Sequence, residues 1–129
     1  MAEAERQARR YFKLHKPIKD REQSKWDALE QIYQQTGIRK PDLDNPPVIP
    51  PAVTHVWAWF FELNRARQSG MGLNPLSWGE IDAYCRLTGQ RMQRWELNLL
   101  VIFDTAFLDV MQKDETEVKE GLDNAETDV

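Results

Sequence analysis

The sequence predicts an all-α protein, on three observations. Apolar residues recur at steps of three and four along most of the chain, the spacing that places them on one face of a helix. Capping residues precede several of these segments and glycines follow them, as at the ends of helices. No segment alternates polar and apolar residues with the period of two that a half-buried strand requires. We therefore expect one small domain of about four helices and a Pro-rich connector in this 129-residue chain.

The two ends of the chain differ in charge. Residues 6–19 hold six basic residues and no acidic one, whereas residues 114–129 hold seven acidic residues and one Lys. Segments with many like charges and few aliphatic residues bury too little apolar surface to fold. We expect a flexible basic N-terminal arm at residues 1–19, a helical domain at residues 20–113 and an acidic disordered tail at residues 114–129. A tail that folds back on the basic arm is the alternative.

The first predicted helix begins with Asp20 as its N-cap and ends near Thr36, where Gly37 supplies a left-handed stop. Its apolar stripe is narrow, so we expect it to pack on one side only. The stripe consists of Trp26, Leu29, Ile32 and Tyr33. Residues 38–51 contain five of the seven prolines, which predicts an extended connector rather than a helix or a strand.

The next predicted helix covers about residues 52–68. The clearest helix start of the chain follows it, because Ser77 and Glu80 have the spacing of a capping box with Trp78 as the first helical residue. That helix ends at Thr88, before Gly89.

The last predicted helix, residues 92–113, has the widest apolar face and is therefore expected to be central. Its apolar stripe comprises Met92, Trp95, Leu99, Ile102, Ala106 and Val110, widened by Leu100, Phe103 and Phe107.

The residue types argue against an enzyme, a metal site and a cofactor. The two His residues stand 40 positions apart, the single Cys85 has no His partner nearby, and no Gly-rich phosphate loop is present. Asp104 lies within an apolar run, and we expect it at an edge position that faces solvent or an Arg. No segment resembles a membrane span or a secretion signal. These features favour a binding protein of a reducing cytoplasm.

One segment has the order of a helix-turn-helix, which leaves a DNA-binding regulator as an alternative. Residues 77–113 form a predicted helix, a Thr-Gly turn and a second helix that starts with Arg91 and Arg94. Arginine reads base edges well. However, the chain outside the tail has 16 basic and 14 acidic residues, which gives little attraction to phosphates, so nucleic acid is the less favoured partner.

The helix at residues 52–68 has more apolar surface than one face requires. At 100° per residue its apolar arc spans about 200°, whereas a surface helix needs little more than about 100°. Either two neighbours bury this helix, or part of the arc is left for another chain. We expect Trp57 and Phe60 in the core and the residues at the edges of the arc at the surface, beside the following loop. The predicted partner-binding or self-association surface therefore comprises Trp59, Phe61, Met71 and Leu73.

Residues 46–108 carry a recognisable series of motifs. After a Pro-rich lead they include W-x-W-F-x-E-L, R-x-x-G-M-G-x-N-P-L-S, E-I-x-A-Y, L-T-G, W-E-L and a helix with a late Asp. In this order and spacing the segment resembles the tail assembly chaperones of long-tailed bacteriophages.

The resemblance implies a protein of the infected host cytoplasm that binds the tape measure protein and recruits tail tube subunits around it. Such a protein leaves before the tail is complete and is absent from the finished virion. It implies no catalytic residue and no cofactor. The chain is then either a free-standing product or the downstream part of an extended frameshift product. A structural tail or connector protein that stays in the virion is a further alternative.

Overall fold

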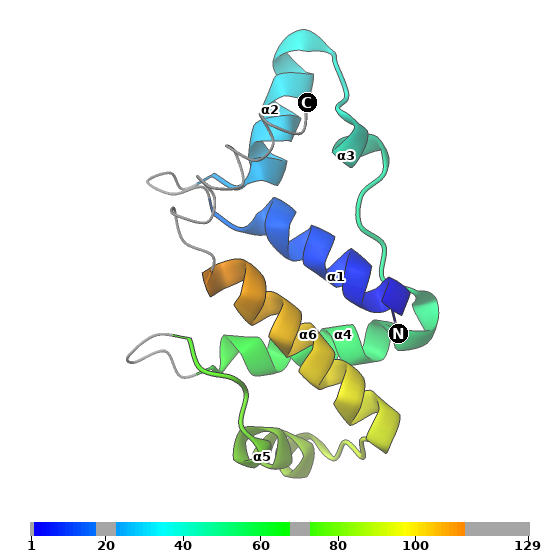
Figure 1. Ribbon diagram of the computed structural model, residues 1–129, viewed down its shortest axis with the longest axis vertical. Helices are drawn as coiled ribbons and strands as arrows, with labels where there is room; N and C mark the ends of the chain where they lie inside the picture. Colours follow the sequence, from blue (N-terminus) through cyan, green and yellow to red (C-terminus); the bar gives the residue numbers. More distant parts are fainter. Residues whose placement is uncertain (1, 18–22, 68–72, 113–129) are drawn as a thin grey trace, which may run out of the picture.

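The computed structural model describes residues 2–17, 23–67 and 73–112 (Figure 1). These residues form helices and connecting loops, and no named strand occurs among them, which confirms the all-α prediction. The predicted helices are present together with two further α-helices and a 3₁₀ turn. The elements are α1 (Ala2–His15), α2 (Lys25–Thr36), α3 (Pro41–Asp44), η1 (Pro51–Val53), α4 (Thr54–Arg65), α5 (Trp78–Thr88) and α6 (Arg94–Gln112).

Helix α6 is the centre of the core, as its wide apolar face predicts. In Figure 1, α1 lies beside α6 and α4 crosses behind it, whereas α2 and α5 lie at opposite ends of the molecule. The largest fully buried side chains come from α4 and α6 alone, and they are Val56, Phe60, Leu99, Leu100 and Phe103.

Within the predicted flexible arm of residues 1–19, Ala2–His15 form helix α1, so the prediction of a flexible arm is wrong for this stretch. Ala4, Ala8 and Phe12 are buried in the main core, and the ring centroid of Phe12 lies 5.3 Å from that of Phe107 in α6. The count of basic residues conceals this apolar stripe, because residues four apart share one face of a helix while the charges occupy the other. The basic side chains of α1 therefore surround a buried contact.

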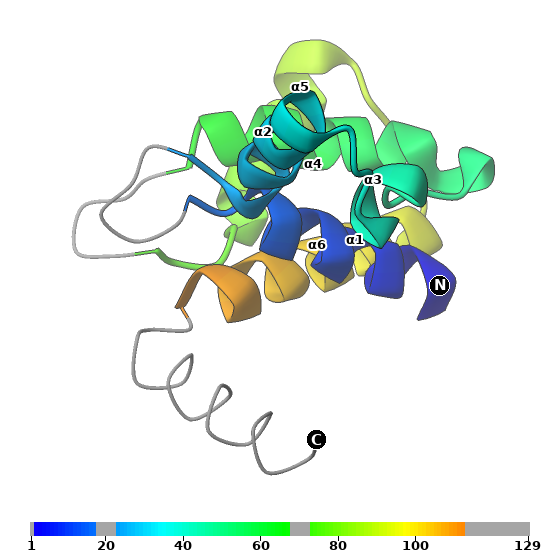
Figure 2. The ribbon, with the colours of Figure 1, turned by 90° about the horizontal axis from the view of Figure 1, so that it is seen from above.

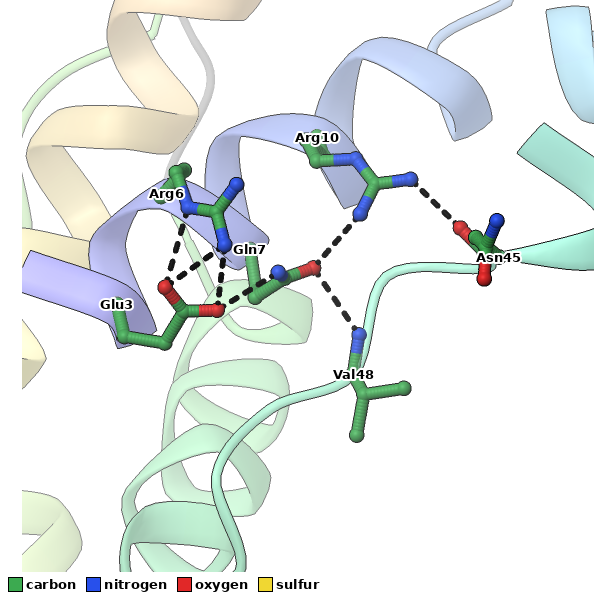
Figure 3. A network of polar contacts seen from close by, with 6 residues as sticks. All are labelled: Glu3, Arg6, Gln7, Arg10, Asn45 and Val48. Carbon is green, nitrogen blue, oxygen red and sulfur yellow. Dashed lines mark hydrogen bonds and ion pairs between the residues drawn. The ribbon is translucent and has the colours of Figure 1, made fainter. Parts of the chain in front are cut away.

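A polar network also holds the Pro-rich connector against α1 (Figure 3). The side-chain amide oxygen of the buried Gln7 accepts hydrogen bonds from the backbone N–H of Val48 (3.2 Å) and from Arg10 (3.1 Å). Arg10 also donates to the backbone carbonyl of Asn45 at 2.6 Å. Proline has no N–H, so the connector has few backbone donors of its own. The bonds from α1 therefore satisfy the Val48 N–H and the Asn45 carbonyl.

Helix α2 begins later than predicted. Its N-cap is Ser24, which forms a capping box with Asp27, and the predicted cap Asp20 lies outside the described residues. The predicted end is confirmed, because Gly37 adopts a left-handed φ of 75°. No residue of α2 is buried, consistent with a helix that packs on one side. Figure 2 shows α2 above α1, on the side away from α6.

The connector is not extended throughout. Pro41 starts the single turn α3, which buries Leu43, and Pro51 starts η1. Proline is well suited to the first turn of a helix, since it fixes φ and its missing N–H has no partner there. The prediction of a purely extended segment is wrong at these two places.

The remaining boundaries agree within a few residues. Helix α4 is shorter than the predicted 52–68, and α6 begins at Arg94. The capping box of Ser77 and Glu80 is present, with Ser77 accepting from the Glu80 N–H at 3.1 Å, and α5 ends before a left-handed Gly89. The predicted acidic tail, residues 114–129, lies outside the described residues.

Candidate partner-binding surface

The aromatic residues of α4 do not divide as the helical arc predicts. Phe60 is fully buried, but Trp57, Trp59 and Phe61 are all half-buried and pack against the core. Tyr11 of α1 lies over this face, with ring centroids 5.4 Å from Trp57 and 5.7 Å from Phe61. Phe61 is therefore not the exposed edge that the arc predicts, because α1 covers part of it.

Trp59 lies on the opposite side of α4, in a cluster that we name the Trp59 cluster. It consists of Trp59, His55, Trp95 and Glu96. The His55 ring is 5.0 Å from Trp59 and 5.7 Å from Trp95, edge-on to both. Trp95 is exposed, so this cluster presents aromatic surface to solvent.

Glu96 fixes the position of the histidine. One carboxylate oxygen of this buried side chain lies 2.6 Å from Nε2 of His55, and the other accepts the backbone N–H of Gln93 at 2.7 Å. The hydrogen bond from Gln93 and, to a lesser extent, the contact with His55 hold the pKa of Glu96 below its usual value. The carboxylate thus acts as a cap near the start of α6 and as an anchor for the aromatic pair.

A buried ion pair contacts the described residues on both sides of the segment that carries the other two predicted residues. Arg67 and Asp104 pair with each other, and their side chains are only 4% and 8% exposed. Arg67 also donates to the Asn74 carbonyl at 2.6 Å, and Asp104 accepts the Leu76 N–H at 2.9 Å. Leu73 in this segment is half-buried, while Met71 lies outside the described residues.

The sequence predicts that Asp104 faces either solvent or an Arg. It faces Arg67, and its side chain is buried. Sequence reasoning did not single out Arg67. The signal was available, because Arg67 opens the R-x-x-G-M-G motif and Asp104 is the late Asp of the same motif series.

A second surface was missed altogether. Between the start of α5 and the outer side of α6 runs an apolar groove, which we name the Trp78 groove. One part has a volume of about 380 Å³ and the adjoining part about 510 Å³, and Trp78 and Val101 line both. Trp78 is 67% exposed and Val101 40%. A signal existed here too, since Leu97, Val101 and Leu108 form a second stripe at steps of four and seven on α6.

The predicted helix-turn-helix has the expected order, α5 followed by a turn and α6. Arg91 and Arg94 are both exposed. However, α6 packs its centre against α1 and α4, and its open side carries Leu97 and Val101. A recognition helix presents polar side chains to base edges, whereas Arg94 here lies at the end of an apolar groove.

Two observations bear on metal binding and on a nucleophile among the described residues. These residues contain no group of three or more His, Cys, Asp or Glu side chains placed to hold a metal ion. Burial raises the pKa of the Cys85 thiol, the opposite of what an activated nucleophile needs. No described helix is long and apolar enough to cross a membrane.

Comparison with known proteins identifies the family. No curated protein and no solved structure matches the chain significantly. The family described as "Phage tail assembly chaperone" matches residues 32–109, which is more than half of the chain and includes α4, α5 and nearly all of α6. The chain therefore belongs to the phage tail assembly chaperone family.

Proposed function

We propose that this protein binds the tape measure protein of its phage and recruits tail tube subunits around it, without catalysing a reaction. It acts in the host cytoplasm and leaves before the tail is complete, so that the finished virion lacks it. The observation that carries this proposal is the family match over residues 32–109.

The proposed contact surface is centred on Trp59. The half-exposed Trp59 and exposed Trp95 supply rigid aromatic area of the kind that dominates binding energy at interfaces. Leu73 lies away from this surface, because its carbonyl accepts a hydrogen bond from Gln112 at the end of α6 (3.1 Å), whereas Trp95 lies in the first turn of the same helix. Phe61 contributes less than first expected, because Tyr11 covers it.

Copurification tests the proposal directly. The tagged protein is expressed with the tape measure and tail tube proteins of the same phage, and both should copurify with it. Mass spectrometry of purified virions should not detect the protein. Binding to neither tail protein contradicts the proposal, and presence in virions favours a structural tail protein instead.

Two substitutions separate binding from folding. We expect Trp59→Ala to weaken partner binding by about 2 kcal/mol with a smaller loss of stability. Trp57→Ala should destabilise the fold by about 3–5 kcal/mol, since its ring lies 4.9 Å from that of Phe103. If Trp59→Ala unfolds the protein as severely as Trp57→Ala, the proposed surface is in the wrong place.

DNA binding is tested by electrophoretic shift on duplex DNA at low and moderate salt. A shift that falls steeply with salt and requires Arg91 and Arg94 favours the regulator instead.

A further inference from the structure

The Trp78 groove lies on the side of α6 that the described residues leave open. At 100° per residue, Val101 points about 160° away from the fully buried Phe103. Trp78 overhangs this side from the first turn of α5, and Leu97 continues it toward the start of α6. An exposed Trp beside two aliphatic residues is a costly surface for a small soluble domain, unless a partner covers it.

The groove has an electrostatic direction. Asp104 and Asp109 line one end, and each has an internal partner, in Arg67 and in Arg9 at 3.2 Å. Arg94 lies at the other end, and within the described part of the chain no carboxylate pairs with it. The Glu96 carboxylate caps the start of α6, so the positive charge at this end of the groove is that of the Arg94 side chain. The groove is therefore apolar along its length and positive where α6 begins.

We propose that the Trp78 groove receives one amphipathic helix of a partner protein, with an apolar stripe along Trp78, Leu97 and Val101 and an acidic residue over Arg94. The inference rests on the proposed function, because it names the kind of tail-protein segment that the chaperone takes. A helix fits better than an extended strand, because the described residues offer no open sheet edge for strand addition.

Helix α1 shows how α6 accepts such a neighbour. Its small apolar residues Ala4 and Ala8 enter the contact, while charged groups close the rim. Arg9 pairs with Asp109, and Lys16 donates to the Val110 carbonyl at 2.9 Å. The proposed partner helix packs on the open side of α6 in the same way. The charges are reversed, because α1 brings basic residues to α6 whereas the partner brings an acidic residue to Arg94.

The test uses overlapping 20-residue peptides that cover the tape measure and tail tube proteins of the same phage. Binding of each labelled peptide to the full-length chain is measured by fluorescence anisotropy. We expect the peptides that bind to be amphipathic with an acidic end. Arg94→Glu or Val101→Glu should lower their affinity at least tenfold. Arg91→Glu and Leu87→Glu are the matched controls and should change affinity less than twofold, since both residues are exposed and neither lines the groove. A peptide whose acidic end is changed to Lys should regain affinity for Arg94→Glu.

The overturning results are distinct from a failure of the proposed function. If the full-length tail proteins copurify but the groove variants bind all peptides like wild type, the groove is wrong and the function stands. If the tail proteins copurify but no peptide binds, the occupant is not a helix. If neither tail protein copurifies and no peptide binds, both proposals fail.

Two further measurements test the other occupants. A dimer detected by light scattering and abolished by Val101→Glu makes a second copy the occupant. Tighter peptide binding in a Val118→Ser, Leu122→Ser variant makes the chain's own C-terminal segment the occupant. Either result overturns the proposal.

Discussion

Removing the Asp104 carboxylate should be among the most destabilising single changes in this protein. Asp104→Ala leaves the Arg67 guanidinium, whose side chain is 4% exposed, without its counter-charge. It also leaves the Leu76 N–H without an acceptor, at the point where the loop joins α5. Removing one partner of a buried pair typically costs about 3–5 kcal/mol, and an unpaired buried backbone donor adds about 1–3 kcal/mol where water does not reach it.

Thermal and urea denaturation, followed by circular dichroism, measure this cost. At about 4 °C per kcal/mol for a chain of this size, loss of the ion pair alone should lower the melting temperature by roughly 12–20 °C, and the unpaired Leu76 N–H should add roughly 4–12 °C. Asp82→Ala is the matched control, because its pair with Arg86 also joins an Asp to an Arg but is about two-thirds exposed on both sides. It should change stability by less than about 1 kcal/mol.

A double substitution separates the pair from its packing. Arg67→Met with Asp104→Leu removes both charges while keeping much of the volume, and should recover part of the loss from Asp104→Ala, as paired apolar replacements often do. If Asp104→Ala costs no more than Asp82→Ala, the ion pair is not buried in solution and the reasoning about the loop fails.

Three further predictions concern α1, Glu96 and Tyr84. Phe12→Ala should lower the free energy of unfolding, measured by urea denaturation, by about 3–5 kcal/mol, because Phe12 is 3% exposed in the core. A change near zero would mean that residues 2–15 are a flexible arm after all. The pKa of Glu96 lies below its ordinary 4.5 in the folded state. Its contribution to stability is therefore present above about pH 4.5 and is lost as the pH falls through the lowered pKa. Between pH 6 and pH 3, Glu96→Gln should lose less stability than wild type, and an equal loss would contradict the contacts of Glu96 with Gln93 and His55. Burial and, after it, the hydrogen bond to Glu62 raise the pKa of Tyr84 to about 12. Ultraviolet titration of Tyr84→Phe should therefore lack the most alkaline phase seen in wild type. If that phase persists, another tyrosine titrates there.

The local signals in the sequence were sufficient for most helix boundaries. The capping box of Ser77 and Glu80 and the left-handed stops at Gly37 and Gly89 depend on residues within a few positions of one another. The same holds for the width of the apolar face on α6, which placed this helix at the centre. Local periodicity decides such features, because the hydrogen bonds and side-chain neighbours involved lie within one or two turns.

Tertiary contacts decided the rest. The charge of residues 6–19 suggested a solvated arm, but Ala8 and Phe12 find their partners about 95 residues later in α6. Arg67 and Asp104 are 37 positions apart, and only the crossing of α4 and α6 brings them together. Trp78 is exposed because α5 packs mainly against α4 and leaves this side chain uncovered beside α6; the apolar stripe of α6 is visible in the sequence, but whether another helix covers it is not. A sequence window records which residues share a face, whereas burial depends on which other face covers it, and that is fixed only when distant helices pack.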